Sequence, residues 1–183
     1  MGPQSTGRPS DLELRPARPA DDQAIRDLTY AAFQNHPHHR AGAAPSEHLI
    51  MGQLRDAGAL TLSLVAERGG TVVGHLAVSP VEICAAKDQG NSVNWFGLGP
   101  VAVSPRCQRL GIGSALIRCA IECLRQKKAS GLVVLGEPQF YRRFGFRAEA
   151  QLSLPGIPPA YFMALPIGGP LPHGNVRYHP AFG

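Results

Sequence analysis

The sequence has little cysteine and few aromatic residues. Its four cysteines, at positions 84, 107, 119 and 123, include no CxxC pair. This spacing and density argue against a disulfide framework, so we expect a reducing, cytoplasmic location. Phe, Trp and Tyr make up 7% of the chain, and no basic cluster is interleaved with them. A nucleic-acid-binding surface needs that arrangement, so we expect no nucleic acid partner.

Long apolar runs are also missing. No stretch approaches the ~20 consecutive apolar residues of a membrane span, and the first ten residues lack the apolar core of a signal peptide. We therefore expect no membrane partner, and we interpret residues 1–10, rich in Gly, Pro and Ser, as a flexible leader. Residues 11–183 contain no internal repeat and are long enough for one core, which predicts a single domain.

Lysine is scarce, and arginine supplies almost all of the positive charge. The 18 basic residues, fifteen Arg and three Lys, stand against 13 acidic residues and give a formal charge of +5. An arginine excess favours anionic partners. Because the arginines are scattered along the chain, they indicate a polyanionic cofactor better than a nucleic acid.

The clearest positive signal runs from Leu98 to Lys128, as an extended apolar segment, a short basic loop and a long helix. Apolar residues recur there at i, i+3, i+4 and i+7, the period of one face of an α-helix. The face consists of Ile112, Ala115, Leu116, Cys119, Ala120, Cys123 and Leu124, widened by Ile117 and Ile121. Its width predicts a helix that lies flat on a sheet.

The start of this helix has the features of an anion site. The first amides of a helix have no intrahelical partner, and they carry the positive end of the helix dipole. Gly111 and Gly113 would let a ligand reach those amides without a Cβ in the way, and Arg106 and Arg109 add positive charge. The loop therefore predicts a phosphate-binding site.

A Rossmann dinucleotide site is the main alternative, because Gly111-x-Gly113 opens a helix and Glu137 ends the next predicted strand. Three details argue against it. Residues 104–110 separate the strand from the first glycine, Leu116 occupies the third glycine position, and only one parallel β-α-β unit is predicted.

Periodicity and turn residues predict an α/β fold, more closely an α+β mixed sheet, with a central β-α-β crossover. A proline at position 80 indicates a bulge or an edge in its strand, and a further turn is expected at 87–91. Strands are predicted over 12–16, 60–67, 72–83, 98–103, 132–135, 146–154 and 160–165, and helices over 19–35, 45–56, 112–128 and 138–145.

A group of histidines, His36, His38 and His39 with His48 further along, suggests a metal site because imidazoles bind zinc. No Cys, Asp or second spaced pair completes a ligand set. We therefore expect no metal, and we interpret the group as an exposed loop between two helices.

Three motifs together resemble the GNAT superfamily of acetyltransferases. They are Gln108-x-x-Gly111-x-Gly113, the segment 95–103 before it, and residues 135–146, which are similar to the LG(D/E)PxxYxRFGF motif of one bacterial branch. The end of the chain, 176–182, also looks like the tail of that branch. The likeness covers residues 12 to 182 and implies a GNAT-like acyl-CoA N-acyltransferase fold.

The resemblance implies acetyl-CoA as cosubstrate and assigns most of the site. The backbone of Val101, Ala102 and Val103 would contact the pantetheine and the thioester oxygen. The loop would hold the diphosphate through Gln108, Arg109, Leu110, Gly111, Ile112, Gly113 and Ser114. Tyr141 would protonate the leaving thiolate, since a phenol of pKa ~10 donating to a thiolate of pKa ~8.5 is uphill by roughly 2 kcal/mol. The other interpretation is that Tyr141 only packs a short helix.

The resemblance also implies a primary amine acceptor, on a small molecule or a peptide, and it is compatible with a homodimer. At pH 7 such an amine is neutral only about four times in ten thousand, so its deprotonation costs ~4.6 kcal/mol. Many relatives carry an acid where this chain has Gly97, and Glu82, His75 or a water chain could serve instead. The missing acid leaves a second hypothesis open, a non-catalytic acyl-CoA-binding module, although a pure binder would not need Tyr141. In the family the helix-helix region overhangs the acceptor, so the histidine group could touch substrate.

Overall fold

The structure is a computed structural model that describes residues 12–34, 45–84 and 94–183. The predicted leader, the turn at 87–91 and the histidines 36, 38 and 39 lie outside these residues. The strands are β1 (Leu12–Pro16), β2 (Leu62–Arg68), β3 (Thr71–Pro80), β4 (Glu82–Cys84), β5 (Trp95–Val103), β6 (Gly131–Leu135), β7 (Leu152–Ser153), β8 (Phe162–Pro166) and β9 (Gly174–Arg177). The α-helices are α1 (Asp22–Phe33), α2 (Glu47–Asp56), α3 (Ile112–Gln126) and α4 (Pro138–Tyr141). The 3-10 turns are η1 (Pro19–Asp21), η2 (Pro105–Cys107), η3 (Arg142–Phe144), η4 (Pro159–Tyr161) and η5 (Pro180–Phe182).

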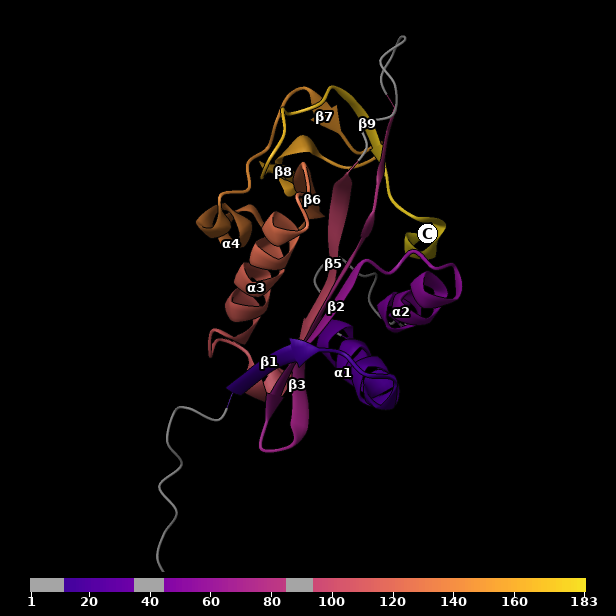
Figure 1. Cartoon of the computed structure of the whole chain (residues 1–183), viewed down its shortest axis with the longest axis vertical. Helices are drawn as coiled ribbons and strands as arrows, with labels where there is room; N and C mark the ends of the chain where they lie inside the picture. The colour runs from indigo at the N-terminus through magenta and orange to yellow at the C-terminus, as the bar shows by residue number, and fades with distance from the viewer. Residues whose placement is uncertain (1–11, 35–44, 85–93) are drawn as a thin grey trace, which may run out of the picture.

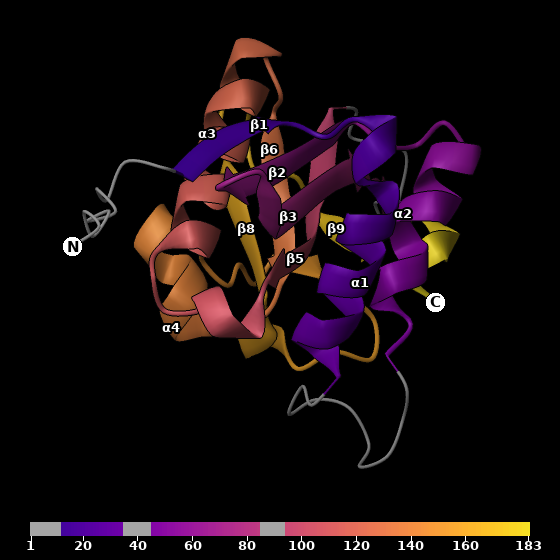
Figure 2. The same cartoon turned by 90° about the horizontal axis from the view of Figure 1, so that it is seen from below.

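A six-stranded sheet in the order β1-β2-β3-β5-β6-β8 forms the centre of the molecule. β5 and β6 are parallel, and the other neighbouring pairs are antiparallel. Helix α3 lies on one side of the sheet, and α1 and α2 lie on the other (Figures 1 and 2). The mixed α/β fold and the central β5-α3-β6 crossover predicted from the sequence are confirmed.

Helix α3 packs one side of its predicted apolar face onto the sheet, and Ala115, Cys119 and Cys123 on the other side of that face are half-buried. The fully or nearly buried side chains of this helix are Ile112, Leu116, Ile117, Ala120, Ile121 and Leu124. Gly74 of β3 allows close approach, since a Cβ there would lie 2.8 Å from Ile112 Cγ2 and 3.1 Å from Leu116 Cδ1. Burial of each larger side chain stabilises the fold by about 1.5–3 kcal/mol. The core thus fixes the direction in which the first turn of α3 points.

The sheet opens between its two parallel strands. β5 pairs with β6 only from Trp95 to Gly97, at the start of β5. The rest of β5 continues along β3 as far as the pair Val103 and Gly74. Among the described strands, none pairs with the other edge of residues 98–103. This leaves backbone groups of β5 facing the opening.

Two of the predicted strands are wrong. The segment 72–83 is not one strand, because β3 ends at Pro80 and β4 then joins a different sheet. Proline has no N–H to continue the ladder, which explains the break. In the segment 146–154 only Leu152–Ser153 is a strand, apart from a single bridge between Arg147 and Ala164. That segment contains Ala, Glu and Gln, which are depleted in strands.

A second, three-stranded sheet, β4-β9-β7, is absent from the sequence prediction. Its strands are very short, and β9 begins with Gly174 and Asn175, residue types with low strand propensity. β9 leads into the C-terminal turn η5, which packs against α2. The C-terminus accordingly lies beside α2 in both views (Figures 1 and 2).

Candidate active site

The predicted anion-binding loop lies at the start of α3, directly after β5. Gly111 is the N-cap residue and has φ +81°, a left-handed conformation that glycine adopts without strain. Gly113 lies in the first turn, where a Cβ would be 3.6 Å from Val103 Cγ2 and 3.8 Å from Phe140 Cζ. The two glycines therefore serve different needs, since Gly111 shapes the turn and Gly113 adjoins the end of β5.

The loop is held against the strand that precedes it. Gln108 Nε2 donates a hydrogen bond to the Val103 carbonyl oxygen at 3.2 Å, so the Gln108 side chain is engaged with the protein itself. Arg109 follows with φ +63°, an uncommon conformation for a residue with a Cβ. The side chains of Arg106 and Arg109 are exposed. They therefore add positive charge beside the free amides of α3.

The side chains and the backbone of the predicted cofactor residues play separate parts. Ile112 and Ala102 are each 1% exposed and belong to the core, so only their backbone can meet a ligand. Val101, Val103 and Ser114 are half-buried. Leu110 is 58% exposed, an unusual state for leucine, and it lies beside the glycines of the loop. The predicted residues thus follow one another along the chain, from the open edge of β5 through the loop to the first turn of α3.

Tyr141 ends α4, the short helix after β6. Its ring packs against Phe140 with centroids 5.0 Å apart, and against Phe146 at 5.9 Å. A Cβ on Gly136 would lie 3.1 Å from Tyr141 Cδ2, so the glycine gives the ring its place at the end of β6. Burial raises the pKa of Tyr141 to about 12. The hydroxyl is therefore neutral at pH 7 and able to donate a proton.

Several of these residues converge where the sheet opens. A Cβ on Gly113 would lie between the side chains of Val103 and Phe140. The start of α3, the end of β5 and helix α4 therefore meet at this position. Phe140 in turn contacts Tyr141. These residues can hold an extended, anionic ligand along β5, with the phenol of Tyr141 at the end of the neighbouring strand β6.

The prediction did not identify Tyr178 as a site residue. A Cβ on Gly97 would lie 2.9 Å from Tyr178 Cδ1 and 3.0 Å from Val81 Cγ1, so the Tyr178 ring occupies the space beside Gly97. The ring also contacts Phe182, with centroids 5.1 Å apart. The sequence signal was indirect, since a glycine in a strand can mark a close approach of another group.

The two side chains considered as a general base are engaged elsewhere. Glu82 lies on β4 and accepts hydrogen bonds from Arg177 Nε at 3.0 Å and Arg177 Nη2 at 2.5 Å. His75 is fully buried on β3, where its Nε2 lies 3.0 Å from Ser63 Oγ. Burial lowers the pKa of His75 to about 4, so this ring is neutral at pH 7. Neither arrangement suggests direct proton abstraction from a ligand.

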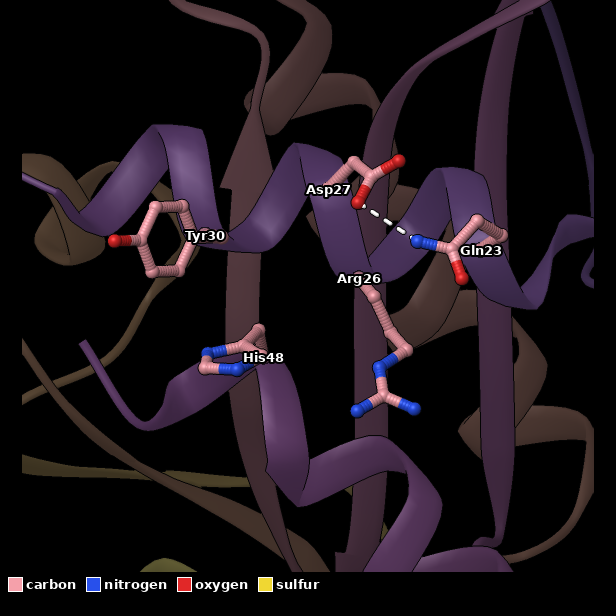
Figure 3. A pocket seen from close by; sticks show the side chains of 5 residues that line it. All are labelled: Gln23, Arg26, Asp27, Tyr30 and His48. Atoms are coloured by element: carbon pink, nitrogen blue, oxygen red, sulfur yellow. Dashed lines mark hydrogen bonds between the residues drawn. The ribbon is translucent and has the colours of Figure 1, made fainter. Parts of the chain in front are cut away.

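A polar hollow of about 540 Å³ lies between α1 and α2 (Figure 3). It is lined by Gln23, Arg26, Asp27, Tyr30 and His48. The His48 ring meets Tyr30 edge to face, with centroids 5.3 Å apart. Among the described residues, no group of three or more His, Cys, Asp and Glu side chains is placed to bind a metal. None of the helices in the described part of the chain is long and apolar enough to cross a membrane.

The family described as "Acetyltransferase (GNAT) domain" matches residues 13–148. The Escherichia coli K12 protein named "Uncharacterized N-acetyltransferase YhbS" is 34% identical over 116 residues. That alignment covers 63% of this chain and 66% of the relative, so the chain spans just under two thirds of the length of this curated relative.

Two solved structures are similar over almost the whole chain. A GNAT family acetyltransferase from Brucella melitensis, in complex with acetyl-CoA, is 43% identical with a TM-score of 0.78, and the match covers 94% of this chain and 98% of that one. YhbS from Escherichia coli, in complex with CoA, is 28% identical with a TM-score of 0.82, and the match covers 98% and 96%.

Proposed function

Because this chain belongs to the GNAT family of acetyltransferases, we propose that it transfers an acetyl group from acetyl-CoA to a primary amine by direct attack, with Tyr141 as general acid. One observation carries the proposal. The open edge of β5 ends at a helix start with free amides, and Tyr141 lies at the end of the adjacent strand β6. The complexes of the similar proteins with acetyl-CoA and CoA support the same cosubstrate for this chain.

The pantetheine and the diphosphate of acetyl-CoA each have a counterpart along β5 and the start of α3. Pantetheine carries amides, so it can pair with the free edge of Val101, Ala102 and Val103 as an additional strand would. The diphosphate fits the amides of residues 111–114, where the helix dipole favours an anion. Arg106 and Arg109 lie on the same loop and add attraction to the negative phosphates.

The chemistry requires a proton for the leaving sulfur. The amine nitrogen forms a bond to the carbonyl carbon, and the C–S bond breaks with its electron pair remaining on sulfur. Tyr141 gives its proton to that thiolate, and the proton lost by the nitrogen returns to the Tyr141 oxygen through solvent. The products are an amide and a free thiol, and the tyrosine is unchanged.

The raised pKa of Tyr141 alters the energetics of this step. A phenol of pKa about 12 is harder to deprotonate than a free phenol by about 2 units, or roughly 2.7 kcal/mol. Burial disfavours any anion, so it raises the pKa of a thiolate leaving in the same opening as well. The free energy of the proton transfer depends on the difference between the pKa of Tyr141 and the pKa of the thiol. Burial raises both, so this difference changes less than either pKa alone.

We include a cytoplasmic location in this proposal, because Cys84, Cys107, Cys119 and Cys123 are all free thiols. Thiols that stay reduced fit a reducing compartment.

The test is release of CoA from acetyl-CoA in the presence of a panel of primary amines, with mass spectrometry of the acetylated product. We expect amine-dependent release at neutral pH, and heat-inactivated protein as the control should give none. If acetyl-CoA binds but no amine is acetylated, the chain is an acyl-CoA-binding module instead.

A further inference from the structure

The hydroxyl of Tyr178 is buried, and it has no hydrogen-bond partner among the described residues. Buried polar groups in proteins are nearly always paired, because leaving one unpaired costs about 1–3 kcal/mol. The residue follows β9, in the C-terminal segment that the main sheet does not need for its own pairing. An unpaired hydroxyl in that place calls for a ligand that would satisfy it.

The ring of Tyr178 lies where β5 leaves β6. Gly97 is the last residue of β5 that pairs with β6, and its missing Cβ would overlap the Tyr178 ring. Two residues further along β5, a Cβ on Gly99 would meet Phe182 Cε1 at 4.0 Å. The C-terminal segment therefore crosses β5 at the very point where the strand opens.

This segment lies on the side of the sheet opposite to α3. Leu98, next to Gly97, points into the core beneath α3, and side chains alternate between the two faces of a strand. The turn η5, which contains Phe182, packs against α2, on the other face. Tyr178 thus approaches the opening from the face that α3 does not cover.

The two tyrosines interact electrostatically. Burial raises the pKa of Tyr178 well above that of a free phenol, and negative charge on Tyr141 raises it further. Tyr141 packs with the core beneath α3, whereas Tyr178 packs with the second sheet. The opening of the sheet therefore has one phenol on each side.

We propose that the Tyr178 hydroxyl is a positioning group for the acceptor, whose amine N–H donates a hydrogen bond to the Tyr178 oxygen. This inference rests on the proposed function. The bond would turn the nitrogen lone pair toward the thioester carbon, while the Tyr178 O–H remains free to donate to a second polar group of the acceptor. The ring fills the space beside Gly97 that a side chain at this position would occupy.

Tyr178 does not act as the base in this scheme. Its neutral form is stable far above pH 7, so it cannot take up the amine proton as a phenolate would. It accepts a hydrogen bond from the acceptor N–H instead, and the amine proton leaves through solvent. Its role is thus separate from that of Tyr141, which donates a proton to the leaving sulfur.

The test compares three single-hydroxyl deletions, Tyr178→Phe, Tyr141→Phe and Ser153→Ala. The two tyrosine variants keep their rings, and Ser153→Ala is the control because it removes an exposed hydroxyl of the second sheet, whose Oγ donates to Asn175 Oδ1 at 2.6 Å. For Tyr178→Phe we expect kcat/KM for the amine to fall ~10- to 100-fold, mostly through KM, with unchanged acetyl-CoA affinity. Its melting temperature should stay level or rise, because a buried unpaired hydroxyl has been removed.

A second measurement needs no turnover. A bisubstrate compound, in which CoA sulfur is joined through an acetyl linker to an amine, should bind the wild type more tightly than CoA does. Tyr178→Phe should lose about tenfold of that gain, and Ser153→Ala should keep it. If Tyr178→Phe keeps both the gain and the wild-type KM, Tyr178 only packs. If the wild type acetylates no amine, the proposed function fails, while the bisubstrate comparison still decides the role of Tyr178.

Discussion

Replacing Gly113 by aspartate should move stability and cofactor binding in opposite directions. Gly113 lies in the first turn of α3, where a Cβ would make only ordinary contacts, 3.6 Å from Val103 and 3.8 Å from Phe140. The side chain therefore fits. A negative charge at this end of a helix stabilises it by about 0.3–1 kcal/mol, and the slightly higher helix propensity of aspartate over glycine adds about 0.1–0.3 kcal/mol. The free variant should melt at or above the wild-type temperature.

Binding should weaken strongly in the same variant. Two unit charges about 5 Å apart, at an effective dielectric constant of about 20, repel by about 3 kcal/mol. That corresponds to roughly a 150-fold loss of affinity for the diphosphate of acetyl-CoA. Gly113→Ala is the matched control, since it adds the Cβ without the charge.

The assay is thermal melting with and without acetyl-CoA, supported by calorimetric titration. At a ligand concentration of a hundred times the wild-type dissociation constant, the wild type gains about 2.7 kcal/mol, and Gly113→Asp should gain less than about 0.5 kcal/mol. A folded Gly113→Asp protein with wild-type affinity would show that the diphosphate does not lie at this helix start.

Two further predictions concern buried groups. His75 has a pKa lowered to about 4, so the unfolded state takes up its proton near pH 6.5 while the folded state does not. The stability that this ring contributes is complete above pH 6.5 and is lost toward pH 4, by about 2 kcal/mol between pH 7 and pH 5. Urea unfolding should show this loss, and a folded His75→Asn protein with the same loss would refute it. Gly97→Ala should displace the Tyr178 ring and lower both the melting temperature and kcat/KM for the amine; unchanged values of both would refute the placement of that ring.

The sequence predicted the parts of the site that depend on local signals. The apolar period of α3, the glycines before it and the motif around Tyr141 lie within one stretch of the chain. The structure has the two helices and the turn where the sequence predicts them, and the roles of their residues in binding and catalysis stay predictions. These features follow from helix periodicity and turn chemistry, which act over a few residues.

The parts that were missed depend on contacts between distant segments. The second sheet brings β4 to β9, and Gly97 meets Tyr178 only because that sheet carries the C-terminal segment across β5. Strands of two to four residues leave almost no periodic signal. The sequence shows that position 97 has no side chain, but it does not show that the Tyr178 ring occupies the space beside it.

The most direct test of the account is the pH dependence of kcat for Tyr141→Phe against that of the wild type. The variant keeps the ring that packs on Phe140 and Phe146, so acetyl-CoA binding should change little. We expect kcat at pH 7 to fall ~10²- to 10⁴-fold. The difference should shrink above the pKa of the leaving thiol, which is ~8.5 in water and higher in the buried opening, because the thiolate can then leave without a proton. A variant with wild-type kcat at pH 7 would contradict the general-acid role of Tyr141.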